Sequence, residues 1–217
     1  MAESNVRNLV LLGRTGRGKS ATGNTLVGRS AFQSQRGAAA CTAQCEVHSK
    51  TYSDGIVVNV CDTPGLFDPG LSNQETLGEL AKVLSLVPGG IIHGALIVLN
   101  GDDTRFTSEE QCALRLLHLL FGPRLFDVAT FVFTRGDYFQ GFTDFEAQVT
   151  TSVFIFAKEE DCYASQFLES SRAQIFIVKQ LELREIRVVL LSRWMPCVSS
   201  RPRVPNRYVA YSVPSLS

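Results

Sequence analysis

The sequence has no excess of charge of either sign. It contains 21 lysines and arginines and 21 aspartates and glutamates in 217 residues, so its formal net charge is zero. Charged residues make up 19% of the chain, against roughly 25% in average domains, and hydrophobic residues make up 45%. This composition excludes an intrinsically disordered chain and a long coiled coil. It gives no global attraction to nucleic acid, and we expect no nucleic-acid partner.

Signals for export, for membrane insertion and for a disulfide framework are also lacking. The first residues, Met1 to Arg7, hold no apolar h-region, so no secretory signal is predicted. The longest uncharged run, residues 83–101, is near membrane-spanning length but contains Pro88, glycines and Asn100. We interpret it as a loop followed by a buried strand and expect no transmembrane segment. None of the six cysteines forms a C-x-x-C pair. Since no secretory signal is predicted, we expect reduced thiols and a cytoplasmic location. Any contact with membranes is expected to be peripheral and to occur through partners.

Strand-like and helix-like segments alternate over the first 150 residues. Continuous apolar runs predict buried strands, and apolar residues at helical spacing predict helices. Strands are expected at residues 8–12, 45–52, 56–61, 95–99 and 128–133, and helices at residues 20–27, 74–87 and 109–121. The turn residues Ser53-Asp54-Gly55 predict a hairpin between the second and third strands. The alternation predicts an α/β fold with a mostly parallel sheet and one antiparallel hairpin strand.

A glycine-rich turn follows the first expected strand and precedes the first expected helix. It matches G-x-x-x-x-G-K-[ST], the pattern of a phosphate loop, in which backbone N–H groups and the helix N-terminus surround phosphate oxygens. Lys19 is expected to contact the β- and γ-phosphates, and the Ser20 hydroxyl to ligate Mg²⁺. The predicted phosphate-binding residues are Gly13, Arg14, Thr15, Gly16, Arg17, Gly18, Lys19, Ser20 and Ala21. The alternative is a glycine-rich turn with a surface lysine.

Three later residues complete a phosphate and metal site. Asp62, in Asp62-Thr-Pro-Gly65, follows the strand at 56–61 and is expected to hold Mg²⁺ through water, while the Gly65 amide approaches the γ-phosphate. Thr42 lies in the loop between Lys19 and Asp62, where a threonine can ligate Mg²⁺ and contact the γ-phosphate. A simple turn at residues 62–65 and a structural role for Thr42 remain the alternatives.

The base is expected to be read by Thr134-Arg135-Gly136-Asp137, which follows the strand at 128–133. A carboxylate at this place accepts two hydrogen bonds from guanine N1–H and N2–H₂. Adenine lacks that pair of donors, and a buried carboxylate without partners is costly, so Asp137 favours GTP over ATP. The tetrapeptide could instead cap a helix.

These residues together resemble the immunity-associated GTPases (AIG-type G domain, GIMAP/IAN-like), a septin-related branch of the phosphate-loop GTPases. The resemblance spans residues 7–149 and is carried by Gly18-Lys-Ser-Ala-Thr-Gly-Asn24, Thr42-Ala-Gln-Cys-Glu46, Gly90-Ile-Ile-His93, Arg105-Phe-Thr-Ser-Glu-Glu110 and Thr134-Arg-Gly-Asp137. It is specific, because ordinary small GTPases lack the box at residues 105–122. The family implies a three-layer phosphate-loop GTPase fold, with helices on both faces of the sheet.

The resemblance also implies domain limits and residue roles. Residues 7–150 are expected to form the AIG-type G domain, and residues 151–217 either a divergent continuation of it or a poorly ordered tail. Asn206 lies in a stretch that resembles the family segment whose backbone touches the base, so it joins Thr134, Arg135 and Asp137 as a guanine-site residue. The family carries histidine where His93 stands, which favours a structural role. Septin-like GTPases pair across the nucleotide face, which implies a homodimer of that kind.

We therefore expect a GTP-binding protein with GTP or GDP as ligand and Mg²⁺ as cofactor. Many small GTPases place a glutamine directly after D-x-x-G to orient the attacking water, and here that residue is Leu66. Hydrolysis is expected to be slow, and no catalytic residue is assigned. Arg14, Arg17 and Arg105 are candidates to stabilise charge across a dimer, and solvated surface positions are the alternative for Arg14 and Arg17. The expected role is a nucleotide-controlled assembly switch; the alternatives are a scaffold with negligible turnover and a phosphate-loop ATPase.

Overall fold

A computed structural model of the chain describes residues 5–34, 42–53, 55–68, 72–100, 107–122, 125 and 128–135, together with the backbone of residues 174–177 and 211–212. The predicted residues Arg105, Gly136, Asp137 and Asn206 lie outside the described residues.

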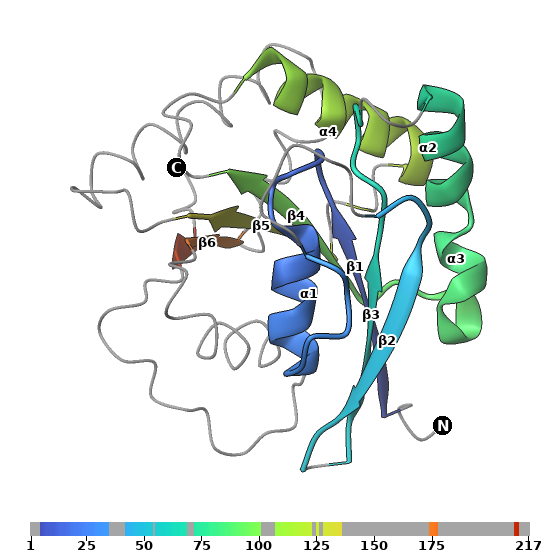
Figure 1. Ribbon diagram of the computed structural model, residues 1–217. Helices are drawn as coiled ribbons and strands as arrows, with labels where there is room; N and C mark the ends of the chain where they lie inside the picture. The colour runs from blue at the N-terminus through green and yellow to red at the C-terminus, as the bar shows by residue number, and fades with distance from the viewer. Residues whose placement is uncertain are drawn as a thin grey trace, which may run out of the picture.

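Among the described residues, seven strands form a sheet at the centre of the fold (Figure 1). The strands are β1 (Val6–Leu12), β2 (Glu46–Thr51), β3 (Val57–Asp62), β4 (Gly94–Asn100), β5 (Ala129–Thr134), β6 (Gln174–Ile177) and β7 (Tyr211–Ser212). Their spatial order is β2-β3-β1-β4-β5-β6-β7. The five central strands run parallel, whereas β2 is antiparallel to β3 and β7 is antiparallel to β6. The predicted mostly parallel sheet with its antiparallel hairpin is confirmed, and the pair β6–β7 adds an antiparallel contact that the sequence did not indicate.

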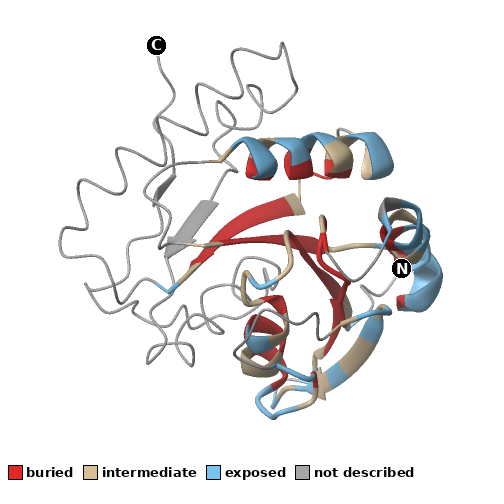
Figure 2. Cartoon of the chain, turned by 45° about the horizontal axis from the view of Figure 1, so that its top comes forward, coloured by how far each residue is buried: buried red, intermediate tan, exposed pale blue. Residues whose placement is uncertain are grey.

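Helices cover both faces of this sheet, so the predicted three layers are present (Figure 2). They are α1 (Lys19–Val27), α2 (Asn73–Ala81), α3 (Val83–Leu86), the short 3-10 turn η1 (Pro88–Gly90) and α4 (Ser108–Phe121). Helix α1 packs on one face, and α2, α3 and α4 pack on the other. No helix in the described parts of the chain is long and apolar enough to span a bilayer.

Two separate hydrophobic clusters explain why the sheet is covered on both faces. Side chains alternate along a strand, so Val10 and Leu12 enter the cluster under α2, α3 and α4, while Leu9 and Leu11 enter the cluster under α1. All four side chains are fully buried. A continuous apolar run in β1 is therefore what a central parallel strand requires.

The single helix expected at residues 74–87 is two helices that meet at Lys82. The Lys82 N–H donates to the carbonyl of Glu79, only three residues back, at 3.0 Å. The Ser85 hydroxyl donates to the Lys82 carbonyl at 2.7 Å. One tightened turn thus interrupts the α-helical bonding, a local change that apolar spacing alone does not reveal.

His93 has the structural role that the sequence favoured. The Asn8 backbone N–H donates to Nδ1 of His93 at 3.0 Å, and the His93 N–H donates to the Asn8 carbonyl at 2.9 Å. An acceptor at Nδ1 requires a neutral ring. Partial burial, with the nearby charge of Arg7, lowers the pKa of His93 below its usual value.

This lowered pKa predicts a loss of stability in acid. The contribution is fully present above about pH 6.5, the ordinary histidine pKa, and is lost as the pH falls through the folded-state value, because the unfolded chain then binds the proton more readily. For one proton the free energy of unfolding falls by at most about 1.4 kcal/mol per pH unit. In His93→Asn, the amide Oδ1 can replace Nδ1 as an acceptor and does not titrate. Urea unfolding at a series of pH values gives the free energy of unfolding of both proteins, and the difference between the two pH profiles measures the contribution of His93. Identical pH profiles for the two proteins would contradict the assignment.

Candidate phosphate and metal site

The predicted phosphate loop runs from the end of β1 to the start of α1. Gly13, Gly16 and Gly18 have φ values of +137°, +76° and +93°, which side-chain-bearing residues rarely adopt. At Gly13 a Cβ would also collide with the carbonyl oxygen of Val98 on β4. The glycine pattern is therefore required by the backbone path itself. The N-cap residue of α1 is Gly18, which has no side chain to bond the first N–H groups of the helix.

Lys19 is held inside this loop. Its side chain is only 6% exposed, and its Nζ donates to the carbonyl of Arg14 at 3.0 Å. Burial lowers the pKa of Lys19 to about 8, and the negative charges of Asp62 and Asp68 act against this shift. The lysine is thus a desolvated cation beside backbone amides, which suits a phosphate-binding role.

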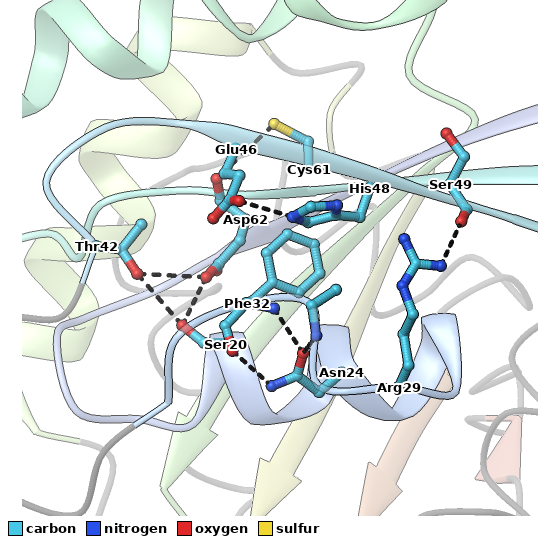
Figure 3. A network of polar contacts seen from close by, with 11 residues as sticks. Ser20, Asn24, Arg29, Phe32, Thr42, Glu46, His48, Ser49, Cys61 and Asp62 are labelled. Carbon is cyan, nitrogen blue, oxygen red and sulfur yellow. Dashed lines mark hydrogen bonds and ion pairs between the residues drawn. The ribbon is translucent and has the colours of Figure 1, made fainter.

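The three predicted metal ligands meet in space (Figure 3). The Ser20 hydroxyl donates to Oδ2 of Asp62 at 2.5 Å, and Thr42 Oγ1 lies 3.3 Å from both Ser20 Oγ and Asp62 Oδ2. They come from α1, from the segment before β2 and from the end of β3. Burial raises the pKa of Asp62, while bonds from Ser20 and Thr42 and the charge of Lys19 oppose the rise.

This set of donors fits Mg²⁺. One carboxylate and two hydroxyls are hard oxygen ligands, which Mg²⁺ prefers, and Mg²⁺ takes few protein ligands when phosphates and water supply the rest. Among the described residues, no group of three His, Cys, Asp or Glu side chains could hold a metal ion. Ser20, Thr42 and Asp62 would hold the ion through one carboxylate and two hydroxyl oxygens.

The segment after Asp62 lies directly against the phosphate loop. The Leu66 N–H donates to the Gly13 carbonyl at 3.1 Å, and the Thr15 N–H donates to the Leu66 carbonyl at 3.4 Å. Gly65 is packed so closely on Thr15 that a Cβ would collide with the Thr15 backbone and hydroxyl. The Leu66 side chain is buried in the core below α2 and cannot orient a water molecule. Sequence patterns gave no signal for Asp68, whose Oδ2 accepts a bond from the Thr15 hydroxyl at 2.7 Å.

The other end of the loop contacts β5. Thr134 Oγ1 lies 2.8 Å from the Arg17 carbonyl and 3.1 Å from the Leu99 carbonyl, and can donate to either. A Cβ at Gly18 would lie 3.2 Å from Cγ2 of Thr134. Thr134, the first residue of the predicted guanine motif, therefore lies beside the phosphate loop, while Arg135 is exposed and Asp137 is outside the described residues.

Arg17 is not a solvated surface arginine. Its guanidinium lies 3.4 Å from Oε1 of Glu110, and the two side chains are 15% and 3% exposed. Glu110 is the third residue of α4 and completes a capping box with Thr107. This ion pair joins the box at residues 105–122 to the phosphate loop.

Asn24 organises the chain that leaves α1 (Figure 3). Its Oδ1 accepts bonds from the N–H groups of Ala31 and Phe32, each at 2.7 Å, and its Nδ2 donates to the Phe32 carbonyl at 2.8 Å. One amide side chain thus bonds three backbone groups of the segment that follows α1. These bonds explain why an asparagine stands at position 24, since its amide can both accept and donate.

Residues 7–152 match the AIG1 family. The chain belongs to this family. Immune-associated nucleotide-binding protein 7 of Arabidopsis thaliana is 47% identical over 130 residues, which are 60% of this chain and 41% of that protein. Immune-associated nucleotide-binding protein 13 of the same plant is 43% identical over 131 residues, 60% of this chain and 38% of that protein. The chain therefore spans about two fifths of the length of these relatives.

Solved structures share the fold at lower identity. Toc33 from Arabidopsis thaliana in complex with Mg²⁺ and GMPPNP superposes with a TM-score of 0.67 at 17% identity, covering 89% of this chain and 86% of Toc33. Era from Aquifex aeolicus bound to GDP and AlF₄⁻ gives a TM-score of 0.63 at 14% identity, covering 95% of this chain and 62% of Era. These likenesses confirm the phosphate-loop GTPase fold.

The close contact between Gly65 and Thr15 predicts that a side chain at position 65 destabilises the fold. Gly65→Ala should lower the free energy of unfolding by about 1–3 kcal/mol, because the added methyl group overpacks the loop. The control is Gly78→Ala in α2, where nothing lies within 4 Å of the added Cβ. It should raise stability by roughly 0.5–1 kcal/mol through helix propensity. Denaturant unfolding of both variants is the measurement, and an undiminished stability of Gly65→Ala would contradict the packing.

Proposed function

We propose that this chain binds GTP with Mg²⁺ and hydrolyses it slowly, as a nucleotide-controlled assembly switch. The observation that carries the proposal is the meeting of Ser20, Thr42 and Asp62 beside the phosphate loop. Three segments far apart in the sequence bring one carboxylate and two hydroxyl oxygens together, which supports a metal site at the place where a phosphate loop would need one. The nucleotide-binding names of the relatives support it, as does Toc33, which was solved with GDP and Mg²⁺ and with Mg²⁺ and GMPPNP.

Each part of the site has a physical task in this proposal. Lys19 and the loop amides neutralise the phosphates, and the Gly65 amide faces the γ-phosphate. Ser20, Thr42 and Asp62 would hold Mg²⁺, which would stabilise the negative charge of the phosphates. Asp137, which follows the described part of β5, would accept the two guanine donors.

Slow turnover is expected because Leu66, and not a glutamine, follows Gly65. Leu66 points into the core, so its side chain cannot hold an attacking water, and the backbone bonds of Leu66 to Gly13 and Thr15 keep it there. Groups from a second chain would then be needed for faster hydrolysis. In the chloroplast translocon components atToc33 and psToc159, dimerization is important for the GTPase activity, which supports pairing as the route here.

Base choice is tested by Asp137→Asn. An amide cannot accept both guanine donors but suits the N1–H and C2=O edge of xanthine. Hydrogen bonds to charged groups are worth about 1.5–3 kcal/mol, so GTP affinity should fall about 10–100-fold while xanthosine triphosphate binds better than before. Isothermal titration with both nucleotides measures this. Lys19→Ala is the control and should weaken both nucleotides alike. Undiminished GTP affinity in Asp137→Asn would exclude Asp137 as the base-reading residue.

Assembly-dependent hydrolysis is tested by phosphate release at increasing protein concentration. At high dilution turnover should take minutes or longer, roughly as in unassisted GTPases. Specific activity should rise with protein concentration, and sedimentation should show dimers with GTP but not with GDP. Dimers without phosphate release would favour the scaffold, and equal hydrolysis of ATP would favour the ATPase. Fast hydrolysis at every concentration would contradict the role of a second chain.

A further inference from the structure

Asp68 is a buried carboxylate that the function proposed above does not use. Its side chain is 5% exposed, and its Oδ2 accepts the hydrogen bond from the Thr15 hydroxyl at 2.7 Å. Phe67, just before it, has a φ of +57°, in the left-handed region that non-glycine residues rarely adopt. This turn follows Leu66, whose backbone is bonded to the phosphate loop at both Gly13 and Thr15. Hydrogen bonds of the preceding Leu66 backbone and of the Asp68 side chain itself therefore fix the position of this carboxylate.

The charge of Asp68 acts on the phosphate-binding cation. Lys19 is desolvated, and the negative charges of Asp62 and Asp68 are the ones that favour its protonated form. Asp62 has the metal-site contacts with Ser20 and Thr42, whereas Asp68 has the loop contact with Thr15. Inside a folded protein such charges are weakly screened, so a carboxylate near Lys19 also repels an incoming phosphate.

The two ends of the phosphate loop have different neighbours, and this locates Asp68. Gly18 lies against Thr134, the first residue of the base motif. Thr15 lies against Gly65, whose amide is expected to approach the γ-phosphate. Since Asp68 is bonded to Thr15, its charge lies at the γ-phosphate end, away from the base. A diphosphate places less charge at that end than a triphosphate does.

We propose that Asp68 is a specificity-determining residue that disfavours the triphosphate and so sets the ratio of GTP to GDP affinity. The inference rests on the proposed function, because it concerns the same nucleotide site. Repulsion from the γ-phosphate acts on Asp68, and Asp68 is bonded to the loop through Thr15. Binding of the triphosphate therefore works against the Thr15–Asp68 bond, whereas binding of the diphosphate leaves it intact.

The test compares GTP and GDP affinity, each with Mg²⁺, in three variants of the full chain. Asp68→Asn removes the charge but keeps an oxygen that can accept from Thr15, and Asp68→Ala removes both. Glu75→Gln is the matched control, since Glu75 is exposed at the start of α2 and the substitution makes the same change in net charge. Thermal unfolding shows which variants are folded.

Asp68→Asn should bind GTP about tenfold more tightly, with GDP affinity changed less than about threefold, because the repulsion is removed mainly at the γ-phosphate. Asp68→Ala should also raise the ratio of GTP affinity to GDP affinity. The proposal can therefore be tested even if one of the two variants is unstable. Glu75→Gln should leave the ratio unchanged.

An equal gain for both nucleotides, an unchanged ratio or a loss of GTP affinity in the folded Asp68 variants would overturn the inference. Failure of the proposed function looks different, because the wild-type chain would then bind neither GTP nor GDP. Lys19→Ala, which should weaken the binding of both nucleotides alike, separates a site that binds phosphate from one that does not.

Discussion

The hydrogen bond between Asn8 and Asn59 fixes the strand register on which the site depends. These two residues are direct partners in the parallel pairing of β1 with β3, both are buried, and Asn59 Nδ2 donates to Asn8 Oδ1 at 2.8 Å. A slip of one residue would turn every side chain of a strand to the other face and leave both amides buried without this bond. The same register sets Leu11 opposite Asp62, which brings the Asp62 carboxylate beside the start of the phosphate loop.

The Asn8 side chain also connects this register to the next strand. Its Nδ2 donates to the carbonyls of Pro88 and Ile91, each at 2.8 Å, in the segment that leads into β4. Strand β4 then pairs with β1 so that Leu12 stands opposite Ile97, and the carbonyl of the next residue, Val98, lies against Gly13. The path of the phosphate loop is thus set by both neighbours of β1. A buried polar network is tolerated in this core because its groups satisfy one another.

Features with a local signal could be predicted from the sequence. A few consecutive residues are enough to indicate each of three features: the apolar run of β1, the glycines of the phosphate loop and the strand before Asp62. The reason is that strand burial and left-handed turns constrain adjacent positions. The order of motifs then placed Ser20, Thr42 and Asp62 near one another, since parallel strands end at the same edge of a sheet. The interruption of the helix at Lys82 and the pairing of β7 have no such local signal.

Two contacts of the phosphate loop with distant segments could not be predicted, because one partner in each already has an ordinary local explanation. Glu110 fits a capping box with Thr107, and Asp68 fits a turn after Gly65, so neither spacing points to the phosphate loop. In the folded chain Glu110 pairs with Arg17 and Asp68 with Thr15, two residues apart in that loop. The loop is therefore held from α4 at one point and from the segment after β3 at another. Helix α4 therefore has a direct contact, through the Arg17–Glu110 ion pair, with the loop that is expected to bind phosphate.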